Sequence, residues 1–126
     1  MITVSEQLAD IPKAVQSTVE AAIKAVRRAA PSADEIPYQM RKPGSDRMMW
    51  KIARYAVDGV NVVGVGTFPR HAAMFFYRGR ELDDGAGLLK GSGKDTRFIT
   101  LRSPADAQSP VVSDLLRRAF LLASRG

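Results

Sequence analysis

The stretch Tyr-Ala-Val-Asp-Gly-Val-Asn-Val-Val, residues 55–63, decides the fold of this chain of 126 residues. At its centre, Asp58-Gly59 separates two apolar runs. A type I′ turn needs positive φ at both central residues, and this pair tolerates that conformation. The stretch therefore predicts a β-hairpin with strands near residues 50–57 and 60–67.

Three other segments have the pattern of strands. Residues 72–77 form an apolar run that suits a covered strand, and residues 97–102 alternate in a strand pattern. Residues 36–41 also alternate, but Pro37 cannot donate a ladder hydrogen bond, so we expect this strand at a sheet edge or with an irregularity. Together with the hairpin, these segments predict an antiparallel sheet of about five strands.

Helical patterns lie at both ends of the chain. Apolar residues at steps of three and four predict an amphipathic helix with Asp10 as its N-cap, Pro12 in its first turn and Pro31 after its end. Near the C-terminus, Ser103-Pro104 and Ser109-Pro110 are two helix-start signals, which predict a single turn followed by the main C-terminal helix. We therefore expect one α+β domain, residues 1–126, whose sheet is packed by N-terminal and C-terminal helices.

Glycines mark two further places. Gly64 and Gly66 fall on one side of the second hairpin strand, where they leave room for a helix or mark a bulge. The segment Gly-Ser-Gly-Lys-Asp-Thr, residues 91–96, invites comparison with a phosphate-binding P-loop, but the first glycine of that motif and the hydroxyl after its lysine are missing, and a β-like run follows instead of a helix. We expect Gly91 and Gly93 to serve a tight turn instead.

Composition excludes several classes of function. The chain has no cysteine, a single histidine and a net charge of +6. It therefore has neither thiolate chemistry nor a disulfide framework. No apolar run is long enough to span a membrane and the first residues lack the pattern of a signal peptide, so we expect a cytoplasmic protein without a membrane partner. The basic residues are dispersed, which is typical of a solvated surface.

The residues give little support to catalysis. His71 is the only histidine, and the serines lie in cap or turn contexts, so we expect no catalytic residue, no cofactor and no enzyme activity. A metal site would need His71 with carboxylates of the set Glu35, Glu81, Asp83 and Asp84. A solitary histidine at a strand start is more often structural, so we assign no metal ligand.

Aromatic residues in the predicted strands raise a second alternative. Beside Arg54, Arg70 and Arg78 they could stack nucleic-acid bases, although a mixed core explains them more simply. These aromatic residues are Trp50, Tyr55, Phe75, Phe76 and Tyr77.

Several segments together resemble a known family. They are Ala-Ala-Pro at 29–31, Tyr-Gln-Met at 38–40, Arg-His at 70–71 before Met-Phe-Phe, and Leu-Leu-Lys-Gly-Ser-Gly-Lys at 88–94 before Arg97. In order and spacing, residues 11–122 are similar to the YdhG-like domain of unknown function. The resemblance implies an α+β domain with an antiparallel sheet between terminal helices. One branch of that family is described as a frataxin-like iron chaperone.

These observations lead to three hypotheses. The first is a small non-catalytic binding or adaptor domain, with a ligand or partner surface near His71, Lys94 and Arg97. Its partner is an unidentified small molecule or protein, and a homodimer is a further candidate. The alternative is a frataxin-like iron or metal chaperone, which the excess of 19 basic over 13 acidic residues does not favour. A third hypothesis is weak, charge-driven nucleic-acid binding, although we do not expect nucleic acid to be the natural partner.

Overall fold

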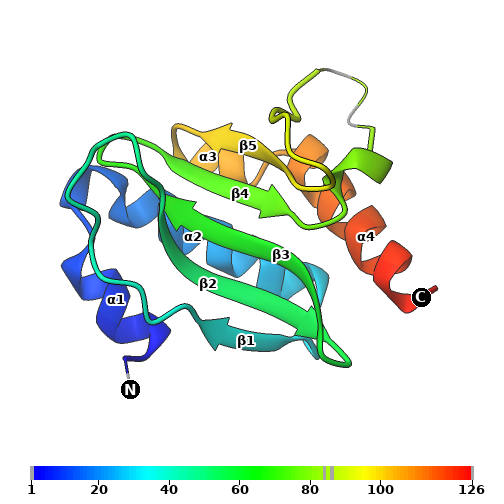
Figure 1. Ribbon diagram of the computed structural model, residues 1–126, viewed down its shortest axis with the longest axis horizontal. Helices are drawn as coiled ribbons and strands as arrows, with labels where there is room; N and C mark the ends of the chain where they lie inside the picture. Colours follow the sequence, from blue (N-terminus) through cyan, green and yellow to red (C-terminus); the bar gives the residue numbers. More distant parts are fainter. Residues whose placement is uncertain (1, 84, 86, 126) are drawn as a thin grey trace.

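The computed structural model describes residues 2–83, 85 and 87–125, and it confirms the α+β fold (Figure 1). The chain forms a five-stranded antiparallel sheet, and helices precede and follow the strands in the sequence. In chain order the elements are α1 Val4–Asp10, α2 Lys13–Ala29, β1 Asp34–Pro37, β2 Trp50–Val57, β3 Val60–Thr67, β4 Ala72–Phe76, the 3₁₀ turn η1 Gly79–Glu81, β5 Arg97–Leu101, α3 Pro104–Ala107 and α4 Pro110–Ser124.

The sheet is a meander in which each strand pairs with the next strand along the chain. Its order is β1-β2-β3-β4-β5, and every pairing is antiparallel. The predicted hairpin is confirmed: β2 and β3 occupy the expected residues, and Asp58 and Gly59 have φ of 51° and 79°. The two residues adopt the left-handed conformation that a type I′ turn requires.

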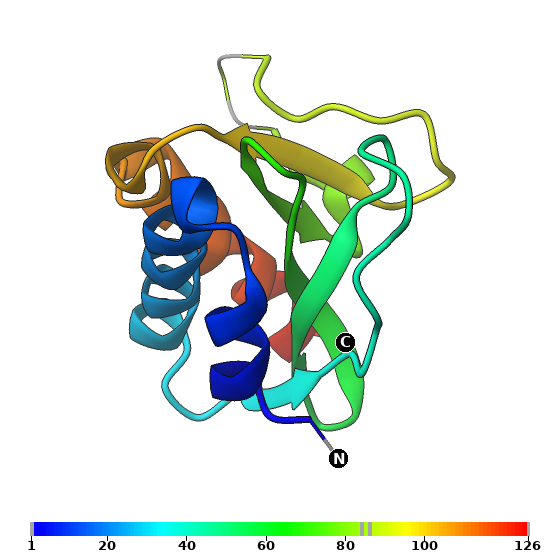
Figure 2. The same ribbon diagram turned by 90° about the vertical axis from the view of Figure 1, so that its left-hand side faces the viewer.

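The helices cover one face of the sheet (Figure 2). On the other side lie the connection of residues 38–49 and part of the loop of residues 82–96, which are teal and yellow-green in the view. Apolar side chains of the covered face pack against α2 and α4 and exclude water. Fully buried members of this core include Val19, Ile23, Val26, Ile52, Val63, Met74, Phe76, Leu101, Leu115 and Leu116. No helix among the described residues has the length and apolar character to span a membrane.

The N-terminal prediction is wrong in one respect, because a separate short helix precedes the main one. Asp10 is the last residue of α1 instead of the N-cap of the next helix, and Pro12 is the N-cap of α2. Thr3 caps α1 by accepting a hydrogen bond from the Glu6 backbone N–H at 3.1 Å. Since a residue before proline avoids the helical region, Ile11 is extended and separates the two helices.

The first strand is shorter than predicted. β1 ends at Pro37, whereas the alternating pattern indicated residues 36–41. Tyr38 still donates its N–H to the carbonyl of Ile52, at 3.1 Å, but Gln39 has φ of 60° and turns the chain out of the sheet. The expected edge position of Pro37 is confirmed, because β1 pairs only with β2.

The C-terminal segment and the glycine loop follow the sequence closely. Ser103 caps α3 and Ser109 caps α4, each by accepting a backbone N–H hydrogen bond, and Pro follows each cap. Strand β5 follows the glycine loop, so the structure also lacks the helix that a P-loop places after its glycines. Gly91 has the expected left-handed φ of 121°, whereas Gly93 is not among the residues with positive φ.

A polar network joins α2 to the first two strands on the covered face. The guanidinium of Arg27 donates two hydrogen bonds to the carboxylate of Glu35, at 2.7 and 2.8 Å, and the hydroxyl of buried Tyr55 donates a third at 2.8 Å. Burial by itself raises the pKa of Glu35, but the hydrogen bonds from Arg27 and Tyr55 outweigh it, so this pKa lies below its ordinary value.

The glycines of β3 make room for side chains of the helix-free face and not for a helix, whereas the alternative expectation of a bulge agrees with a register irregularity between Lys51, the partner of Gly66, and Ala53. A Cβ at Gly64 would lie 2.1 Å from two ring carbons of Phe75, and a Cβ at Gly66 would lie 2.7 Å from the side chain of Met49. Both side chains lie on the helix-free face. Because Gly64 and Gly66 have no side chains, Phe75 and Met49 can pack closely against β3 at these two positions.

We expect Glu35→Gln to remove an acid-sensitive part of the stability. A carboxylate with a lowered folded pKa stabilises the protein above its unfolded pKa, and this contribution is lost as pH falls below about 4.5 towards the folded value. The free energy of unfolding in urea should therefore be lower for the variant at pH 7, and the difference should shrink at pH 3. Glu20→Gln, on the exposed side of α2, is the control. A difference that is equally large at both pH values would contradict the role of the Glu35 charge.

We expect Gly64→Ala to destabilise the protein by about 1–3 kcal/mol, the usual cost of overpacking. The new methyl group would displace the ring of Phe75, a residue that is only 5% exposed. Gly44→Ala is the matched control, because its Cβ meets no heavy atom within 4 Å. Denaturant unfolding measures both variants. Equal stability of Gly64→Ala and the wild type would show that Phe75 does not depend on this glycine.

Candidate functional site

The helix-free face of the sheet carries an ordered row of side chains that crosses all five strands. The strand register places Ile36, Arg54, Gly64, Phe75 and Phe98 opposite one another in turn. Directly opposed residues of antiparallel strands project to the same face. One cation, one glycine and two aromatic residues therefore line up between β2 and β5.

Three aromatic rings form a cluster around this row. The ring centre of Phe75 lies 6.2 Å from that of Tyr38 and 5.7 Å from that of Tyr77. The two pairs have the tilted and edge-on geometries that aromatic rings prefer. The hydroxyl groups of Tyr38 and Tyr77 are hydrogen-bonded to each other. These contacts join the chain just after β1 to the end of β4, so the cluster has a fixed place on the sheet.

Two cations lie over two of these rings, those of Tyr38 and Phe75. The ammonium of Lys51 lies 5.6 Å from the ring centre of Tyr38 and 5.8 Å from that of Phe75, and the guanidinium of Arg54 lies 5.4 Å from the ring centre of Tyr38. Cation–π attraction holds each charge over the ring faces. Neither side chain forms an ion pair with any residue that the structure describes. We call Tyr38, Lys51, Arg54, Phe75 and Tyr77 the cation–aromatic cluster.

The cluster is positively charged at neutral pH. Burial and, second, the hydrogen bond with Tyr38 raise the pKa of Tyr77 above its ordinary value. The Tyr77 hydroxyl is therefore protonated and neutral, although nearby Arg54 acts in the opposite direction. With two cations and no carboxylate partner among the described residues, the cluster carries a net positive charge.

His71, the first residue of the predicted ligand surface, lies in the turn before β4. Its ring stacks on that of Phe68, with centres 4.8 Å apart, and its carbonyl accepts hydrogen bonds from the Phe68 N–H and the Thr67 hydroxyl. Burial and, second, the positive charge of Arg102 lower the pKa of His71, which keeps the ring neutral at physiological pH. These contacts give His71 a part in shaping the turn.

Arg97 and Lys94 lie at the opposite end of the β4–β5 pair from His71. Arg97 faces Phe76 in the register, whereas Leu101 faces Ala72, next to His71. Four residues along a strand correspond to about 13 Å, so the three predicted residues do not converge on one small-molecule site. Arg97 donates to the carbonyls of Gly93 and Thr96 and thereby folds its own loop. Lys94 is exposed in that loop.

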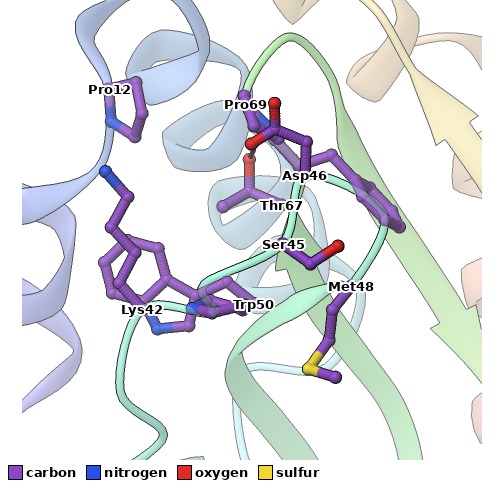
Figure 3. A pocket seen from close by; sticks show the side chains of 10 residues that line it. Pro12, Lys42, Ser45, Asp46, Met48, Trp50, Thr67 and Pro69 are labelled. Carbon is purple, nitrogen blue, oxygen red and sulfur yellow. Dashed lines mark hydrogen bonds between the residues drawn. The ribbon is translucent and has the colours of Figure 1, made fainter.

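A small cavity lies beside the His71 turn, between the start of α2 and the ends of β2 and β3 (Figure 3). Its lining includes Lys42, Asp46, Trp50 and Thr67. The cavity volume of about 30 Å³ has room for about two water molecules. It is too small for an organic ligand, and it does not include any residue of the cation–aromatic cluster.

Three of the four carboxylates considered for a metal site, Glu35, Glu81 and Asp83, lie among the described residues. Glu35 binds Arg27, and Glu81 binds Arg78 at 2.6 Å. Asp84 lies outside the described residues. Within residues 2–83, 85 and 87–125, no three His, Asp or Glu side chains are placed to hold a metal ion. A metal-delivery function therefore has no preformed site in that part of the chain.

The aromatic residues proposed from sequence for base stacking divide between the two faces. Trp50, Tyr55 and Phe76 are buried in the core, and only Phe75 and Tyr77 lie in the cluster. Sequence reasoning missed Tyr38 and Lys51 as site residues. The alternation of Tyr38 with Ile36 indicated that the two side chains lie on one face. Because β1 ends at Pro37, however, strand pairing does not reveal that Tyr38 contacts Phe75 and Tyr77.

No model of a known protein family, no curated protein and no solved structure matches this chain.

Proposed function

We propose that this chain is a small non-catalytic binding domain that holds an anionic partner on the helix-free face of its sheet. The observation that carries the proposal is the placement of Lys51 and Arg54 over the rings of Tyr38 and Phe75 without an ion-pair partner among the described residues. Here the rings hold the cations and leave their charge available.

The neighbouring charges support this proposal. The 38–49 connection on the same side contains Arg41, Lys42 and Arg47 against one acidic residue, Asp46. By contrast, Arg117 and Arg118 of α4 both pair with Asp114, at 2.7 and 2.9 Å. The helix-free side thus carries several cations and few carboxylates, which favours attraction of an anionic partner to that side.

We also propose membership of the YdhG-like family. Its support is the resemblance of residues 11–122, and the α+β order that the resemblance implies is the one observed. The proposed anion site does not depend on that membership, because it rests on the cluster alone.

We expect the double variant Lys51→Ala/Arg54→Ala to bind long-chain inorganic polyphosphate at least about tenfold more weakly than the wild type. A hydrogen bond to a charged group contributes about 1.5 kcal/mol or more, and 1.4 kcal/mol corresponds to tenfold in affinity. Titration calorimetry at low salt measures the change, and added salt should weaken wild-type binding.

Lys24→Ala/Arg28→Ala is the matched control. It removes one lysine and one arginine from the exposed side of α2, where neither forms an ion pair with a described residue. The control should retain wild-type affinity within about twofold. If both double variants lose affinity equally, the net charge of +6 and not the cation–aromatic cluster determines binding.

A further inference from the structure

We propose that the anionic partner is single-stranded nucleic acid, bound across the cation–aromatic cluster and Phe98. This inference rests on the proposed anion-binding function and names the class of partner. It follows from the combination of a sheet face free of helices, cations and half-buried aromatic residues, which a simple anion site would not need.

The charge pattern along the face suits a phosphodiester chain. The register gives a second row beside the first, in which Lys51, Gly66, Ala73 and Thr100 lie opposite one another. Neither row contains a carboxylate, so a polyanion crossing the strands meets the two cations and no like charge in these rows. Cationic grooves that follow the backbone are typical of proteins that bind single strands.

The same rows offer planar groups for unstacked bases. Tyr38, Tyr77 and Phe98 are half-buried, so these aromatic residues are not enclosed in the core. The guanidinium of Arg54 lies against Tyr38 and supplies a further plane. Bases stack on aromatic rings and on guanidinium planes alike. The row from Arg54 to Phe98 crosses three strand spacings, about 14 Å, and four-stranded sheets with such rings stack two or three bases.

A duplex or an acidic polypeptide fits this face less well. In a duplex the base planes are stacked inside the helix and cannot stack on rings of the sheet face. An acidic polypeptide such as polyglutamate would pair with Lys51 and Arg54 but has no aromatic or base plane to stack on the rings of Phe98 and Tyr77. Single-stranded nucleic acid uses both the charges and the rings.

The test is fluorescence anisotropy with a labelled mixed-sequence single strand of about 12 nucleotides, a length within the usual site sizes of single-strand binders. Competitors are the duplex of the same sequence, inorganic polyphosphate and polyglutamate. The single strand should bind at least about fivefold more tightly than the duplex, since base stacking contributes about 1–3 kcal/mol per base.

Ring variants separate stacking from charge. Phe98→Leu and Tyr38→Leu should each weaken single-strand binding at least about fivefold. Phe98 lies outside the cation–aromatic cluster, so Phe98→Leu should leave polyphosphate binding within about twofold of the wild type. Tyr38→Phe keeps the ring and should bind the single strand normally. Phe120→Leu, on α4 at the helical side, is the matched control. Thermal unfolding checks that each variant is folded.

The outcomes distinguish the two proposals. Equal affinity for single strand and duplex, tighter binding of polyglutamate, or no effect of either ring variant would overturn the nucleic-acid inference. The anion-binding function would still stand if Lys51→Ala/Arg54→Ala remained defective toward polyphosphate. Absence of binding to every polyanion would overturn both.

Discussion

The arrangement of the helix-free face depends on one contact, the ring of Phe75 lying over Gly64. Any side chain at position 64 would occupy the space of that ring, because a Cβ there would lie 2.1 Å from two of its carbons. The open position on β3 lets the ring lie across the neighbouring strand, where it meets Tyr38 and Tyr77. The rings in turn provide the faces over which Lys51 and Arg54 are held.

The two faces of the sheet therefore have different energetic roles. On the covered face, apolar burial against α2 and α4 supplies most of the stability, and Arg27, Glu35 and Tyr55 satisfy one another's polar groups at its margin. On the open face, aromatic contacts partly offset the loss of hydration of the two cations. The rings hold the side chains of Lys51 and Arg54 in place without neutralising their charge, an arrangement that is suited to binding an external anion.

The sequence was sufficient for most of the fold but not for the site. The Asp58-Gly59 turn and the two Ser-Pro helix starts are local signals, and they predicted β2, β3, α3 and α4 correctly. The register was not local: counting back from the turn pairs Arg54 with Val63, but an irregularity between Tyr55 and Ala56 shifts it to Gly64. That shift, which no local pattern reveals, aligns Arg54 with Phe75. Likewise, the short α1 lacks the length for a clear periodic pattern.

The most direct test of this arrangement is the ¹H NMR shift of the Gly64 α protons, because protons beneath an aromatic ring are moved upfield. With Phe75 over Gly64, these resonances should lie well upfield of those of Gly44, whose surroundings are open. They should return towards ordinary values in Phe75→Leu. Ordinary Gly64 shifts in the wild type, unchanged in the variant, would contradict the contact on which the cation–aromatic cluster depends.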